Sequence, residues 1–149
     1  MTIDISEVLA NHKFGPSPGS ARPLFIAIAG GSGSGKTTIA RSVVDLVGRE
    51  KVVYIQQDAY YRDQAHLTFE ERARINYDHP DSIEMELIAE HLGELRSGSA
   101  IERPIYDFSQ HVRTDETYTI APEPIVIVEG ILVLADERLR DLFDVRVFI

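Results

Sequence analysis

The sequence predicts an α/β fold in which a parallel sheet is flanked by helices. The first observation is the apolar run Leu24–Ala29, which reads as a buried strand and is followed directly by a glycine-rich loop and a helical pattern. The second is Ile125–Val128, a continuous apolar run of the kind expected for a parallel strand buried on both faces. Strands that alternate with helices in this way are typical of α/β domains.

The loop after the first strand has the composition of a phosphate-binding loop. Gly30-Gly31-Ser32-Gly33-Ser34-Gly35-Lys36-Thr37 fits the pattern of two glycines, lysine and a hydroxyl residue without a mismatch. Glycines let backbone N–H groups point inward, and the N-terminus of the next helix adds partial positive charge. We therefore expect this stretch and Thr38 to bind a nucleoside triphosphate. Lys36 would reach the β- and γ-phosphates, and the Thr37 hydroxyl would bind Mg²⁺.

Two other interpretations of the loop are less favoured. A flexible Gly/Ser linker would not be expected between a strand and a helix, whose apolar face is formed by Ile39, Val43, Leu46 and Val47. A dinucleotide-binding loop would suit the position of Asp58, but no three glycines here have G-x-G-x-x-G spacing. The sequence therefore favours a nucleoside triphosphate over NAD.

The composition excludes several classes of function. A chain of 149 residues is long enough for one domain with a core. The net charge of −9 argues against nucleic acid or an anionic membrane as the main partner. The absence of cysteine excludes disulfides, a thiolate nucleophile and a cysteine-based zinc site. Neither a membrane-spanning run nor a secretory or transit signal is visible.

The segment before the first strand is expected to be a flexible leader, Met1–Pro23, with residues 24–149 forming the domain. The first helix should end near Gly48, and Val52–Ile55 reads as a second short buried strand. Thr68–Glu71 has the spacing of a capping box, which predicts a short charged helix ending near Ile75.

A longer helix is predicted from about Asp81 and Glu84 to Gly98. Its buried face consists of Met85, Ile88, Leu92 and Leu95. His91 on this helix is expected to be partly solvated rather than a ligand.

Two extended segments, Ala100–Phe108 and Arg113–Ile120, are then predicted to pair as a projecting antiparallel hairpin. After the strand Ile125–Val128, a helix is expected around Ala135–Leu142, and Val145–Ile149 begins another strand with an uncovered edge.

Acidic residues follow two of the predicted parallel strands. Ligands of α/β sheets bind beyond the carboxyl ends of the strands, where Asp58 and Glu129 are expected to lie. Such acids also serve as ordinary turn or capping residues. Beside a phosphate loop, we expect Glu129 to hold Mg²⁺ directly or through water, and Asp58 to face a phosphate acceptor or to join the metal site.

A set of polar and aromatic residues favours an organic acceptor over water. Carboxylates can bind both hydroxyls of a ribose, and tyrosine and histidine can stack on a base or hydrogen-bond to it. Taken singly, such residues are usually core or surface residues, but here they gather in irregular segments. The set is Tyr61, Tyr77, Asp78, Tyr106 and His111.

Together these motifs resemble the uridine kinase (uridine–cytidine kinase) family of P-loop nucleoside kinases, over about Leu24–Ile149. The phosphate loop is shared by many NTPases, whereas the Tyr-Asp-His-Pro and Tyr-Asp-Phe stretches are more specific. The matching stretches are Gly30–Thr38, Gln57–Tyr61, Asn76–Pro80, Pro104–Phe108 with His111 and Arg113, and Val128–Leu132.

The resemblance implies a P-loop NTPase three-layer fold and phosphorylation of the 5′-hydroxyl of uridine or cytidine to UMP or CMP, with ATP or GTP and Mg²⁺. It implies that Asp58 is the general base, that Asp78 binds the ribose hydroxyls, and that Tyr106 and His111 contact the pyrimidine. Tyr61 would line the nucleoside pocket beside Tyr77, and Thr37 and Glu129 would serve Mg²⁺. Family members are typically cytoplasmic homo-oligomers, commonly tetramers, of pyrimidine salvage.

Family members also continue beyond the position of Ile149, through an arginine-bearing lid and a final strand. We therefore expect a C-terminally truncated chain with slow turnover, because such arginines are worth about 10³ to 10⁵ in rate. Two alternatives stay open: a related small-molecule kinase resembling phosphoribulokinase, and a non-catalytic nucleotide-binding fragment. A regulatory GTPase is disfavoured, because no Asn-Lys-x-Asp motif occurs.

Overall fold

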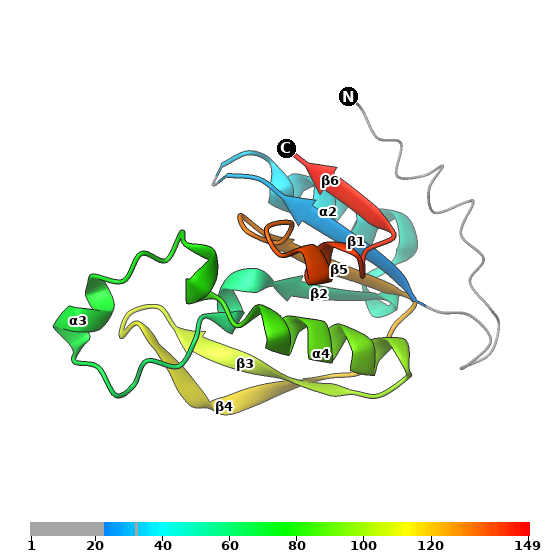
Figure 1. Cartoon of the computed structure of the whole chain (residues 1–149). Helices are drawn as coiled ribbons and strands as arrows, with labels where there is room; N and C mark the ends of the chain where they lie inside the picture. Colours follow the sequence, from blue (N-terminus) through cyan, green and yellow to red (C-terminus); the bar gives the residue numbers. More distant parts are fainter. Residues whose placement is uncertain (1–22, 32) are drawn as a thin grey trace.

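The computed structural model describes residues 23–31 and 33–149, and Figure 1 shows how their elements are arranged. The predicted leader, apart from Pro23, and Ser32 of the loop lie outside the described residues. The described elements are β1 (Leu24–Ala29), α2 (Lys36–Val47), η1 (Arg49–Lys51), β2 (Val52–Gln56), η2 (Gln57–Tyr60), α3 (Phe69–Ala73), η3 (Pro80–Ser82), α4 (Met85–Arg96), β3 (Ile101–Asp107), β4 (Val112–Ile120), β5 (Ile125–Gly130), α5 (Glu137–Arg140) and β6 (Val145–Phe148).

The main sheet is parallel, as the apolar runs predict. Its strand order is β2-β5-β1-β6, and β5 therefore lies between two neighbours. Leu24 pairs with Ile125 on one side of β5, and Gln56 pairs with Glu129 on the other. This register brings the carboxyl ends of β1, β2 and β5 to one edge of the sheet, where the predicted site residues follow.

Both faces of this sheet are covered, which confirms the α/β class. Side chains alternate between faces along a strand. In β1, Ile26 and Ile28 pack into an apolar cluster with Ala40 and Val43 of α2, whereas Phe25 and Ala27 belong to a second cluster that includes the buried face of α4. Figure 1 shows α2 and α4 on opposite sides of the sheet.

The α4 helix forms where predicted, but its buried stripe is wider than expected. Met85, Ile88, Leu92 and Leu95 are buried, and so is His91, which is only 7% exposed. The expectation of a partly solvated His91 was therefore wrong. The reason is that α4 also packs against η2, where the hydroxyl of Tyr60 lies 2.8 Å from His91 Nδ1 and gives the buried ring a hydrogen-bond partner.

The predicted hairpin is confirmed as a separate two-stranded antiparallel sheet, with Ile101 opposite Ile120. It lies below α4 in Figure 1. At the start of α3, the Glu71 N–H donates to Thr68 Oγ1 at 3.2 Å. Thr68 therefore caps this helix, as the capping-box spacing predicts.

The helix predicted around Ala135–Leu142 is shorter, covering only α5, and β6 pairs with β1 at the edge of the sheet. Within the described residues, no helix combines the length and apolar character needed to cross a membrane.

Candidate functional site

A cavity of about 240 Å³ opens at the carboxyl ends of the parallel strands. Its walls come from the start of α2, the end of β2 with η2, the loop before α4, and the end of β5. Five predicted site residues line it together: Lys36, Asp58, Tyr61, Asp78 and Glu129. Residues that are distant in the sequence thus meet in one space, as the rule for ligands of α/β sheets predicts.

The glycine-rich loop has the backbone shape of a phosphate cradle. Gly33 and Gly35 have φ values of 78° and 100°, in the left-handed region where a side chain would be strained. At Gly30 the requirement for glycine is steric, because a Cβ there would lie 2.7 Å from Ser34 Oγ and 2.8 Å from the Ile149 carbonyl oxygen. Gly35 directly precedes α2, so the loop ends at a helix N-terminus that attracts anions.

Two polar groups of this loop suit a phosphate. Lys36 is buried, and its Nζ donates to the Gly31 carbonyl oxygen at 2.8 Å. Ser34 Oγ is buried and finds no hydrogen-bond partner among the described residues. A buried hydroxyl without a partner is costly, and a phosphate oxygen could accept its hydrogen bond. Thr37 and Thr38 are exposed at the start of α2, so their hydroxyls are accessible to a ligand.

One strand-end carboxylate alters the electrostatics of the other. Burial, and next the negative charge of Glu129, raise the pKa of Asp58 above its ordinary value. The positive charges of Arg103 and Lys36 act in the opposite direction. Asp58 nevertheless remains accessible to solvent at the cavity, so it could meet a substrate.

Glu129 has a partner that the sequence did not reveal. The hydroxyl of Tyr54, on β2, donates a hydrogen bond to Glu129 Oε2. Burial, and next this hydrogen bond, raise the pKa of Tyr54, so the hydroxyl keeps its proton and remains a donor. A tyrosine within an aliphatic strand was a visible signal, but its partner depends on the pairing of β2 with β5.

The acidic residues could assist a metal but do not enclose one. The described residues contain no group of three or more His, Asp or Glu side chains that could hold a metal ion. Glu129, Thr37 and Asp58 offer oxygen ligands, which Mg²⁺ prefers, and Mg²⁺ commonly completes its shell with phosphate oxygens and water. The donor set therefore fits a metal that arrives with a nucleotide.

Gln57 is a second residue that sequence reasoning missed as part of the site. It is buried, its Oε1 accepts the Leu132 N–H at 3.0 Å, and its Nε2 lies 3.4 Å from Met85 Sδ. Gly130 leaves room for this side chain, because a Cβ there would come within 2.4 Å of Gln57 Oε1. Gln57 thus fixes η2, which carries Asp58, against the end of β5.

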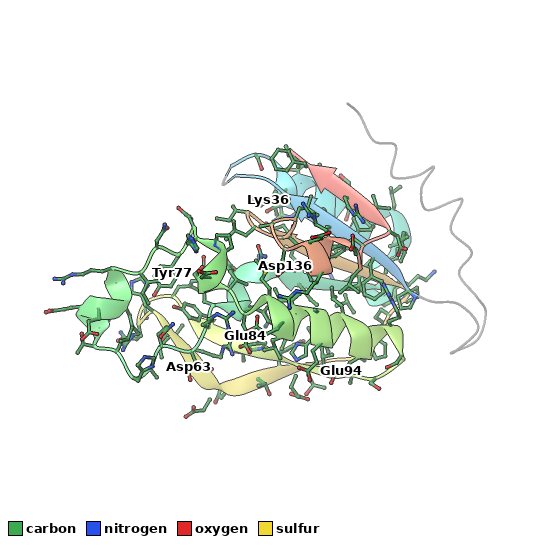
Figure 2. All side chains as sticks on the ribbon, viewed as in Figure 1. Lys36, Asp63, Tyr77, Glu84, Glu94 and Asp136 are labelled. Atoms are coloured by element: carbon green, nitrogen blue, oxygen red, sulfur yellow. The ribbon has the colours of Figure 1, made fainter. Side chains whose placement is uncertain are left out.

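The aromatic residues form a cluster that reaches the cavity through Tyr61. The Tyr61 ring centroid lies 4.9 Å from that of Tyr77 and 5.2 Å from that of Tyr106, and the hairpin residue Phe108, which we did not predict, also contacts Tyr61. Tyr77 stacks on His111 with centroids 5.6 Å apart. In Figure 2, Lys36 lies on the side of the parallel sheet and Tyr77 on the side of α3.

The predicted acceptor residues are therefore brought together, with one distinction. Tyr61 and Asp78 line the cavity, whereas Tyr77, Tyr106 and His111 lie in the adjoining cluster. Tyr106 is buried, and its hydroxyl is 3.4 Å from that of Tyr77. A flat ligand in the cavity would meet this cluster at Tyr61, the ring of the cluster that lines the cavity.

The chain is similar to a known family and to known proteins. The model of a family described as the phosphoribulokinase / uridine kinase family matches residues 25–149. Uridine kinases of Streptococcus thermophilus and Halalkalibacterium halodurans are each 48% identical over 128 residues, which cover 86% of this chain and 61% of the relative. The chain thus spans less than two thirds of the length of these relatives.

Solved structures share the fold. A possible uridine kinase from Bacillus stearothermophilus has a TM-score of 0.68 at 19% identity, covering 97% of this chain and 76% of that one. Phosphoribulokinase from Rhodobacter spheroides has a TM-score of 0.65 at 17% identity, and the match covers 85% of this chain and 50% of that one. At such low identity, the likeness supports the architecture of the sheet and its helices alone.

Proposed function

Because the chain belongs to the phosphoribulokinase / uridine kinase family, we propose that it forms the core of a pyrimidine nucleoside kinase. The reaction transfers the γ-phosphoryl group of ATP or GTP to the 5′-hydroxyl of uridine or cytidine. The nucleoside diphosphate and UMP or CMP are the products. The observation that carries the proposal is a cavity that Lys36 of the phosphate loop lines together with the acidic residues Asp58 and Asp78.

On the donor side, the loop and α2 supply charge and hydrogen bonds. Lys36 exchanges its bond to the Gly31 carbonyl oxygen for phosphate oxygens, and Ser34 Oγ gains the partner that it lacks within the described part of the chain. Thr37 and Glu129 are the residues that would hold Mg²⁺. When bound, Mg²⁺ neutralises negative charge on the phosphates.

On the acceptor side, Asp58 takes the proton of the attacking hydroxyl. Its raised pKa makes the carboxylate a better proton acceptor than that of an ordinary aspartate. Asp78 binds the ribose hydroxyls, and Tyr61 lines the wall beside the sugar. Tyr77, Tyr106 and His111 bind the base by stacking and hydrogen bonding, since their rings lie in one cluster that adjoins Tyr61.

The test is the release of ADP from Mg-ATP with and without an acceptor, in the chain and in the longest natural polypeptide that contains it. Uridine or cytidine should increase the release, and Lys36→Met should abolish the increase. A panel with a sugar phosphate distinguishes a kinase that resembles phosphoribulokinase, which would respond to that acceptor alone. Mg-ATP binding by calorimetry without transfer to any acceptor would instead favour a nucleotide-binding fragment.

A further inference from the structure

One arginine joins the hairpin to both segments that carry the acidic acceptor residues. Arg113 lies on β4, opposite Tyr106. Its Nη1 donates to Glu84 Oε1 at 2.7 Å, and its Nη2 donates to the carbonyl oxygens of Tyr61 at 2.8 Å and Tyr60 at 3.2 Å. Figure 2 shows Glu84 at the N-terminal end of α4. The side chains of Arg113 and Glu84 are only 17% and 28% exposed, so their ion pair is largely shielded from water.

The two segments that Arg113 contacts also bind each other. The Glu84 N–H donates to the Tyr60 carbonyl oxygen at 2.9 Å, and the Arg62 N–H donates to the Ser82 carbonyl oxygen at 2.9 Å. These bonds form an antiparallel bridge between Tyr61 and Ile83, which both line the cavity. One segment continues from the turn that carries Asp58, and the other follows the loop that carries Asp78. The bridge therefore lies directly behind the acceptor side of the cavity.

We propose that Arg113, together with Glu84, is a positioning residue for the acceptor site. Arg113 is not one of the residues that line the cavity. It acts through the main chain at Tyr60 and Tyr61, which it holds against the hairpin. A planar guanidinium can bind a carboxylate and two carbonyl oxygens in one fixed geometry, whereas a lysine ammonium is a point charge on a flexible stem. The identity of the acceptor in this inference rests on the proposed function.

The chain supplies a matched control for the test. Arg62 and Glu86 also form a two-bond pair between the same two segments, with Nη–Oε distances of 2.6 Å and 3.1 Å. Their side chains are 38% and 50% exposed, and the remaining bond of the Arg62 guanidinium, from Nε, goes to the Asp81 carbonyl oxygen rather than to the hairpin. Arg62→Lys thus replaces a guanidinium by an ammonium in an ion pair of the same two segments, but it leaves their contact with the hairpin intact.

The kinetic comparison is between Arg113→Lys and Arg62→Lys. Arg113→Lys should lower kcat/KM for uridine by about 10- to 100-fold, because a misplacement of about 1 Å can cost that much. In Arg113→Lys, KM for Mg-ATP should change by less than about 2-fold. In Arg62→Lys, both kcat/KM for uridine and KM for Mg-ATP should change by less than about 2-fold, as for most surface substitutions. A rise in KM for Mg-ATP as large as the loss in kcat/KM for uridine would indicate general damage to the fold and would overturn the positioning role.

Hydrogen exchange tests the same contact without any ligand. Arg113→Lys, but not Arg62→Lys, should speed amide exchange at Arg62 and Glu84, whose N–H groups form the bridge. Unchanged exchange would overturn the inference even if the wild-type protein phosphorylates uridine. Conversely, faster exchange in a protein without uridine kinase activity would support the positioning contact and reject the proposed function. If Arg113→Lys does not fold, Glu84→Gln, which keeps the carbonyl contacts and removes the charge pair, serves in the same two measurements.

Discussion

Removing the Tyr54 hydroxyl tests the metal side of the site, since the hydroxyl donates to Glu129 Oε2 and Glu129 is proposed to serve Mg²⁺. Tyr54→Phe keeps the ring that packs beside α2 and removes only this donor. A hydrogen bond to a charged group contributes about 1.5 to 3 kcal/mol. Because Tyr54 is only half-buried, we take the lower end of that range, which corresponds to roughly 10-fold in an equilibrium constant.

The assay is a Mg²⁺ titration of activity at saturating nucleotide and acceptor, accompanied by calorimetric binding of Mg-ATP. The Mg²⁺ concentration for half-maximal activity should rise about 10-fold in Tyr54→Phe, within the range found when the outer partner of a metal ligand is lost. Tyr118→Phe, on the exposed hairpin surface, is the matched control and should leave the titration unchanged. An unchanged or tighter Mg²⁺ dependence in Tyr54→Phe would refute the view that Tyr54 orients Glu129 for the metal.

Three further predictions concern the turn that carries Asp58. Asp58→Asn should lower kcat by about 10²- to 10⁴-fold with little change in the Kd of Mg-ATP, and an unaltered kcat would remove Asp58 from the role of base. Since burial and Glu129 raise the pKa of Asp58, kcat/KM should fall with decreasing pH at a higher pH than an ordinary carboxyl pKa of about 3.9 would give; a midpoint at that value would contradict the assignment. His91→Phe leaves the Tyr60 hydroxyl without its partner and should lower the free energy of unfolding in urea by about 1 to 3 kcal/mol, whereas adding Tyr60→Phe should recover part of the loss. A double variant less stable than His91→Phe would argue against that hydrogen bond.

The parts of the fold that were predictable are those with local signals. The apolar run Leu24–Ala29 and the glycine loop with its left-handed Gly33 and Gly35 are encoded within a few neighbouring residues. Asp58 and Glu129 were found because a general rule places ligands at strand ends, and the register that pairs Gln56 with Glu129 agrees with it.

The residues that were missed depend on contacts between segments distant in the sequence. Burial of His91 requires η2 to supply the Tyr60 hydroxyl, and a helical pattern alone does not show that a second element covers the same face. Tyr54 finds Glu129 only through the pairing of β2 with β5. The role of Arg113 requires the hairpin, η2 and α4 to meet, which no spacing in the sequence specifies.

The most direct test of the central claim is the fate of the labelled γ-phosphoryl group of ATP when uridine is present. If the cavity between Lys36 and Asp58 is the place of transfer, the label appears in the 5′-monophosphate of uridine. Its rate of appearance should fall by about 10²- to 10⁴-fold in Asp58→Asn. Label recovered only as inorganic phosphate, or formed in UMP equally fast by Asp58→Asn, would contradict the claim.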